Sequence, residues 1–66
     1  VGDGPGAAAA WRASLEVNPF NPYAWRDLAR ALRRLGDAAG AQTAAVAALR
    51  LGPGDEVFQR SVVGGP

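Results

Sequence analysis

The sequence contains no cysteine, histidine or lysine, and each absence removes a class of protein. Without cysteine, the 66 residues cannot be held together by disulfides, as many small secreted domains are. Without histidine, the chain lacks the usual general base and the commonest metal ligand. Its few hydroxyl side chains have neither histidine nor lysine to activate them, so we expect no active site, metal site or cofactor.

The chain also lacks a long apolar run and a strong net charge. No stretch approaches the ~20 residues that span a bilayer, and the start has neither the basic nor the apolar region of a signal peptide. We expect a soluble chain that does not insert into membranes, with its compartment left open. Seven arginines against six acidic residues give a net charge of +1, which does not indicate a nucleic acid as partner.

Bulky apolar side chains are scarce as well. Of the residues, 48% are nominally hydrophobic, but fifteen of these are alanine, which contributes little buried surface. A chain of this length buries only about 60% of the surface that its unfolded form exposes. The first residue is valine rather than methionine, which we interpret as the sign of a fragment of a longer protein or of a processed chain. Heavy use of alanine, glycine and arginine is typical of GC-rich genomes and favours a bacterial source.

Three clusters of glycine, proline, asparagine and aspartate divide the chain, at residues 18–22, 35–37 and 52–55. Each combines a helix end with a helix start. Asn21 can cap a helix that has Pro22 in its first turn, and Gly36 suits a left-handed helix end before Asp37 as the next cap. Between the clusters, apolar residues recur at helical spacing and do not alternate. The pattern predicts an all-α fold of about four helices, at residues 7–17, 22–35, 38–51 and 55–63.

The sequence repeats itself at an interval of 34 residues. This shift superposes a leucine and a proline near the end of one predicted helix on the same residue types near the end of another, with several alanines. The pairs are Leu15 and Leu49, Pro19 and Pro53, Ala7 and Ala41, Ala10 and Ala44, Ala13 and Ala47, Arg26 and Arg60, and Leu28 and Val62. Such a period, made of two antiparallel helices, predicts stacked helical hairpins.

In this respect the chain resembles the tetratricopeptide repeat (TPR) family, whose pattern is W-x2-L-G-x2-Y, eight residues, then A-x3-F-x2-A-x4-P. The residues at these spacings are Trp25, Leu28, Ala29, Leu32, Ala41, Ala45, Ala48 and Pro53, with Trp11 and Pro19 in a half repeat before them. The resemblance implies a module over residues 7–63, with one full repeat between two half repeats, and both tryptophans in the core. Gln59 departs from the expected tryptophan, for which Val57 and Phe58 could compensate. We expect residues 1–6 and 64–66, which are rich in glycine, to be flexible.

Several arginines share one face of the second predicted helix. Arg26, Arg30 and Arg33 stand at i, i+4 and i+7, where like charges cost about 0.2–0.5 kcal/mol per pair. In the TPR family the first helix of each hairpin lines a concave surface that receives peptides. The resemblance places in that groove Tyr23, Arg26, Asp27, Arg30, Arg33 and Arg60. Two interpretations stay open: a groove for an acidic partner, or a solvated face on which Asp27 pairs with Arg30 and Arg33 complements the helix dipole.

The resemblance implies a protein–protein interaction module that docks a peptide, a helix or a neighbouring subunit on its concave face or open repeat ends. Two other functions stay open, namely an architectural subunit or tail within a larger assembly, and an accessory segment of a larger enzyme. The shortage of bulky apolar residues also predicts that the chain completes its core against further repeats, another chain or a copy of itself.

Overall fold

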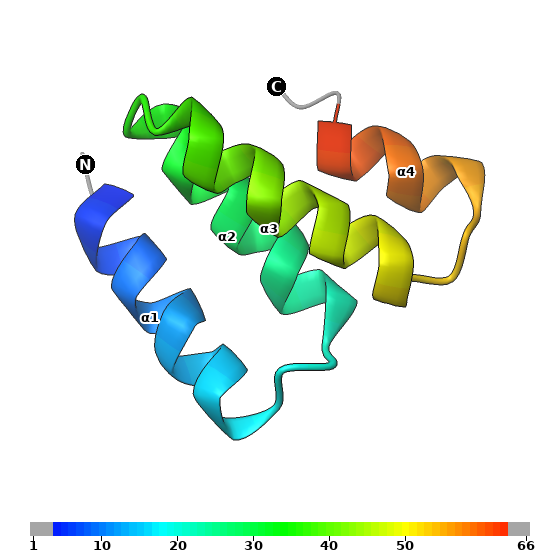
Figure 1. The fold of residues 1–66 in the computed structure, drawn as a ribbon, viewed down its shortest axis with the longest axis horizontal. Helices are drawn as coiled ribbons and strands as arrows, with labels where there is room; N and C mark the ends of the chain where they lie inside the picture. Colours follow the sequence, from blue (N-terminus) through cyan, green and yellow to red (C-terminus); the bar gives the residue numbers. More distant parts are fainter. Residues whose placement is uncertain (1–3, 64–66) are drawn as a thin grey trace.

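The computed structural model describes residues 4–63, which contain four helices and no strand (Figure 1). The helices are α1 (Gly4–Val17), α2 (Pro22–Arg34), α3 (Ala38–Leu51) and α4 (Glu56–Val63). The all-α fold class that the sequence predicts is confirmed. No helix within residues 4–63 has both the length and the apolar character that a membrane crossing requires. The flexibility expected of residues 1–3 and 64–66 lies outside the described residues.

The helix ends differ from the expected ones by a few residues. α1 begins at Gly4, three residues earlier than expected, and so takes in part of the stretch expected to be flexible. Its proline lies in the first turn, where a helix needs no N–H donor, so the Gly-Pro-Gly sequence does not prevent the helix from starting there. α2 ends at Arg34 with Leu35 as its C-cap, and α4 begins at Glu56 rather than at the residue before it.

Side-chain caps start three of the helices. The side chain of Asn21 accepts a hydrogen bond from the backbone N–H of Tyr23 at 3.0 Å, with proline in the first turn of α2. Asp37 accepts from the N–H of Gly40 at 2.9 Å at the start of α3, and Asp55 accepts from the N–H of Phe58 at 2.7 Å at the start of α4. These bonds satisfy amides that have no partner within the helix.

The second helix lies at the centre of the fold. α2 packs against each of the other three helices, whereas among the described residues α1 touches only α2. α3 lies along α2 in the most extensive of these contacts, and α4 rests on both α2 and α3. α1 and α4 therefore lie on opposite sides of the α2–α3 hairpin (Figure 1).

Alanine dominates the core. Eight of the thirteen buried apolar residues within the described chain are alanines, and Phe58 is the only aromatic side chain among the thirteen. Small side chains at the contacts allow helix axes to approach closely. The repeat positions Leu28, Ala29, Leu32, Ala41, Ala45 and Ala48 are all buried.

The two tryptophans are only half-buried and pack against the edge of this core. The indole N–H of Trp25 donates to the backbone oxygen of Pro19 at 2.7 Å, which ties the α1–α2 loop to α2. Trp25 thus lies between the loop and the hairpin, at the edge of the core and not in its centre, where we expected both tryptophans.

Candidate functional site

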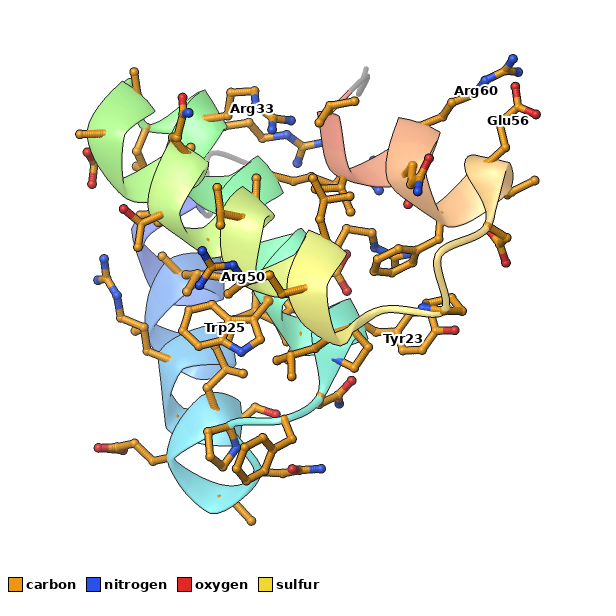
Figure 2. All side chains as sticks on the ribbon, turned by 45° about the vertical axis from the view of Figure 1, so that its right-hand side comes forward. Tyr23, Trp25, Arg33, Arg50, Glu56 and Arg60 are labelled. Atoms are coloured by element: carbon orange, nitrogen blue, oxygen red, sulfur yellow. The ribbon has the colours of Figure 1, made fainter. Side chains whose placement is uncertain are left out.

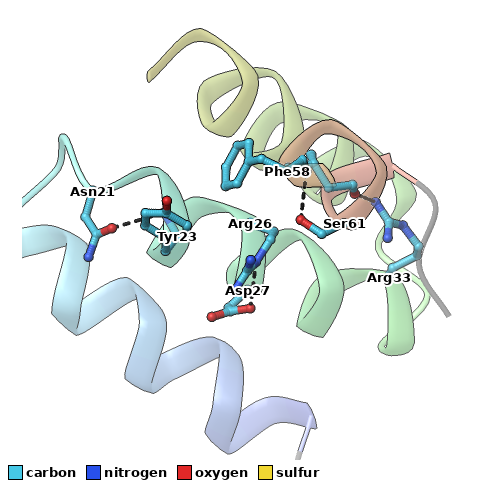
Figure 3. A network of polar contacts seen from close by, with 8 residues as sticks. Asn21, Tyr23, Arg26, Asp27, Arg33, Phe58 and Ser61 are labelled. Atoms are coloured by element: carbon cyan, nitrogen blue, oxygen red, sulfur yellow. Dashed lines mark hydrogen bonds and ion pairs between the residues drawn. The ribbon is translucent and has the colours of Figure 1, made fainter. Parts of the chain in front are cut away.

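Two aromatic rings meet where the first turn of α2 faces the first turn of α4. The rings of Tyr23 and Phe58 lie edge to face, with centroids 5.3 Å apart and planes at 81°. The side chain of Asn21 caps α2 at the N–H of Tyr23 (Figure 3), and that of Asp55 caps α4 at the N–H of Phe58. Phe58 is buried and Tyr23 is half exposed, so Tyr23 is the ring of this pair that reaches the surface.

Arg26 lies over this aromatic pair. Its guanidinium carbon is 5.4 Å from the centre of the Tyr23 ring and 5.9 Å from that of Phe58, within the range of cation–π attraction. The Nε atom of Arg26 also donates to Asp27 Oδ1 at 3.2 Å. Asp27 thus binds its neighbour Arg26, and not Arg30, with which the interpretation as a solvated face paired it (Figure 3).

Arg30 lies one turn further along α2 and is half-buried. Within residues 4–63, no carboxylate or carbonyl oxygen binds its guanidinium. Asp27 supplies one negative charge beside the two arginines, Arg26 and Arg30. The three side chains together therefore carry a net charge of +1.

Arg33 and Arg60 have other contacts. The guanidinium of Arg33 donates to the backbone oxygen of Val62 at 2.8 Å, and so caps the C-terminal end of α4 from α2. Arg60 pairs with Glu56 one turn away, and both side chains are largely exposed at the outer edge of α4 (Figure 2). We name the surface formed by Tyr23, Arg26, Asp27, Arg30 and Phe58 the α2/α4 face.

Of the six residues expected in the groove, the structure thus brings Tyr23, Arg26 and Asp27 into one contact network and leaves Arg30 beside it. Sequence reasoning mentioned Phe58 only as a substitute for a missing tryptophan and did not place it at the site. The 34-residue shift could have indicated this position, because it aligns Phe58 with Ala24, which is fully buried. A phenylalanine ring is much larger than the methyl group of alanine. At an equivalent position it therefore extends toward a neighbouring helix.

A hollow lies on the other side of the hairpin, between the α1–α2 loop and α3. It measures about 540 Å³, and its lining includes Phe20 together with Trp25 and Arg50, which are labelled in Figure 2. Arg50 is the only charged residue in this lining, and Phe20 is largely exposed. The hollow is therefore apolar with one cation at its edge, whereas the α2/α4 face combines two arginines with aromatic rings.

Comparison with known protein families places residues 10–43 in a tetratricopeptide repeat. This match covers 34 of the 66 residues, from the middle of α1 through α2 into α3. The chain belongs to the tetratricopeptide repeat family. The family resemblance seen in the sequence is thereby confirmed, and with it a general role as a protein-interaction module of a non-catalytic family. Comparison with curated proteins gave no match, and neither did comparison with solved structures.

Proposed function

We propose that the α2/α4 face of this TPR module binds an acidic, extended segment of a partner protein. The observation that carries the proposal is Arg30, a half-buried residue whose guanidinium no carboxylate within the described chain neutralises, beside the exposed ring of Tyr23. In the family, the first helices of the hairpins line the concave surface, and α2 and α4 are the first helices here. We also take the chain to act by binding alone, as its family does.

The chemistry of the face supports an anionic occupant. Arg26 and Arg30 stand at i and i+4, a like-charge spacing that costs a helix about 0.2–0.5 kcal/mol. A carboxylate between them would remove that repulsion. Tyrosine and arginine are also the residue types that most often carry binding energy in protein interfaces. Arg26 is already held in place by Asp27 and the rings, so it would lose little freedom on binding.

The proposal is tested with a defined probe, an acetylated peptide of alternating glutamate and tyrosine, titrated into the chain by calorimetry or NMR. A peptide with lysine in place of glutamate serves as the charge control. The variant Arg26→Ala/Arg30→Ala should bind the acidic peptide about tenfold more weakly, which corresponds to roughly 1.4 kcal/mol, and with a flatter salt dependence.

The matched control is Arg34→Ala/Arg50→Ala, which removes the same charge from exposed arginines outside the face. It should leave the affinity within about twofold of the parent chain. Unchanged affinity in the Arg26→Ala/Arg30→Ala variant, or equal binding of the acidic and basic peptides, would exclude the face as the binding site.

A further inference from the structure

The bounds of the helices follow the 34-residue repeat more closely than the residue types do. A shift of 34 residues carries the bounds of α1, Gly4–Val17, onto those of α3, Ala38–Leu51. The same shift carries the first residue of α2 onto the first residue of α4. α2 and α3 form a complete hairpin, so α1 corresponds to the second helix of a hairpin and α4 to the first helix of another.

Exposure differs between equivalent positions on α1 and α3. On α3, Ala44 and Ala48 are 1% and 0% exposed because they pack in the core beneath α2. Their equivalents on α1 are Ala10, which is exposed, and Ser14, which is half-buried. α1 thus keeps the small side chains with which a second helix meets its first, while part of that surface is uncovered.

α4 shows the complementary difference. Ala29 of α2 is fully buried, whereas its equivalent Val63 is 61% exposed. Gln59, the equivalent of the half-buried Trp25, is exposed as well. The side of α4 that corresponds to the α3-facing side of α2 is therefore open within the described chain. We name the α1 surface around Ala10 and Ser14 the α1 end face, and the α4 surface around Gln59 and Val63 the α4 end face.

We propose that the α1 end face of one copy packs on the α4 end face of a second copy, and so rebuilds the α2–α3 packing between two molecules. A second copy is the occupant because the chain itself carries both halves of this interface in the same 34-residue register. Val63 is an exposed apolar side chain on the α4 end face, and the α1 end face offers it the small side chains of Ala10 and Ser14. The inference does not depend on the function proposed for the α2/α4 face.

Polar groups also suit this pairing. Trp25 and Arg50 line one hollow between the start of α2 and the end of α3. The shift of 34 residues turns this pair into Gln59 on α4 and Glu16 on α1 of the second copy. A glutamine amide can donate to a carboxylate, so the rebuilt interface brings the Gln59 donor to the Glu16 acceptor.

The two end faces differ, so the contact is heterologous and repeats head to tail. Each contact is formed by the α1 end face of one molecule and the α4 end face of another. Blocking either face on all molecules therefore abolishes association, whereas mixing two chains that are blocked on opposite faces permits one contact and no more. A symmetric dimer, which pairs like surfaces, would not behave in this way.

The experiment is analytical ultracentrifugation of the 66-residue chain over a concentration series up to about 1 mM. The parent chain should sediment faster as its concentration rises. Ala10→Glu, on the α1 end face, and Val63→Lys, on the α4 end face, should each stay monomeric. An equimolar mixture of the two should form a one-to-one dimer that does not grow further.

The matched controls are Ala39→Glu and Phe20→Lys, which change exposed residues outside the two end faces and should associate like the parent chain. Circular dichroism checks that each variant keeps its helices. A parent chain that is monomeric at every concentration overturns the proposal. Association that survives either end-face variant, or a mixture that remains monomeric, assigns any contact to another surface and overturns it as well.

Discussion

Phe58 is the side chain on which the position of α4 depends most. It is 5% exposed, contacts the Tyr23 ring edge to face and lies beneath the guanidinium of Arg26. A Cβ atom built on Gly52 would fall 2.4 Å from this ring, so the chain before α4 also lies against it. Besides Phe58, only Val62 anchors α4 in the buried core.

The variant Phe58→Ala removes this anchor. Truncation of a buried phenylalanine costs about 3–5 kcal/mol, and we expect the lower end, about 3 kcal/mol, because α4 lies at the end of the fold and can settle toward α2. A domain of this size has a total stability of roughly 3–10 kcal/mol, at about 0.05–0.15 kcal/mol per residue. The loss is therefore comparable with the total, and α4 should detach while α1, α2 and α3 remain packed.

Two measurements distinguish local detachment from general destabilisation. Compared with the parent chain, the variant should show faster amide hydrogen exchange in α4, with a smaller change in α2 and α3. Urea denaturation should give a lower m-value, because a native state with α4 detached exposes less new surface on unfolding. Phe20→Ala is the matched control: Phe20 is 73% exposed, so its loss should change stability by no more than about 0.5 kcal/mol. A stability loss below about 1 kcal/mol for Phe58→Ala, with unchanged exchange in α4, would refute this reasoning.

Two further predictions concern the joint between α2 and α3. Gly36 has a φ of 84° with open space around it, so Gly36→Ala should cost about 1–2 kcal/mol through the left-handed backbone alone, and Gly36→Asn should cost less; thermal unfolding of both variants checks the order. Asp37 accepts the hydrogen bond that starts α3, so Asp37→Ala should cost about 0.5–2 kcal/mol while Asp37→Asn stays close to the parent chain, and equal urea midpoints for the two variants would show that the cap is not the cause.

The parts of the fold that local chemistry determines could be predicted from the sequence. Asparagine before proline, and glycine before aspartate, specify a helix start and a helix end whatever else surrounds them. These signals therefore predicted four helices and most of their bounds. The start of α1 was missed because glycine and proline at residues 4–6 are typical of loops, although a proline in the first turn is compatible with a helix.

The site was less predictable because its side chains are directed by contacts between helices. Helical spacing placed Arg26, Arg30 and Arg33 on one face, but it could not show that two rings would hold Arg26 beside Asp27. Nor could it show that Arg33 reaches across to the end of α4. These outcomes depend on Phe58, whose direction follows from the approach of α4 to α2, and that approach is a property of the packed fold.

The division of large apolar side chains between the core and the surface affects how this chain can contact other proteins. Five large apolar side chains are buried within residues 4–63, whereas nine large hydrophobic side chains are exposed, among them Phe20, Val57 and Val63. A core built mainly of alanine brings helices close together but leaves few sites for larger groups, so those groups remain at the surface. Exposed apolar surface in patches is typical of sites that meet other proteins. In this small repeat module, the alanine content that permits close helix packing therefore also leaves large apolar side chains at the surface, where contact with another protein would bury them.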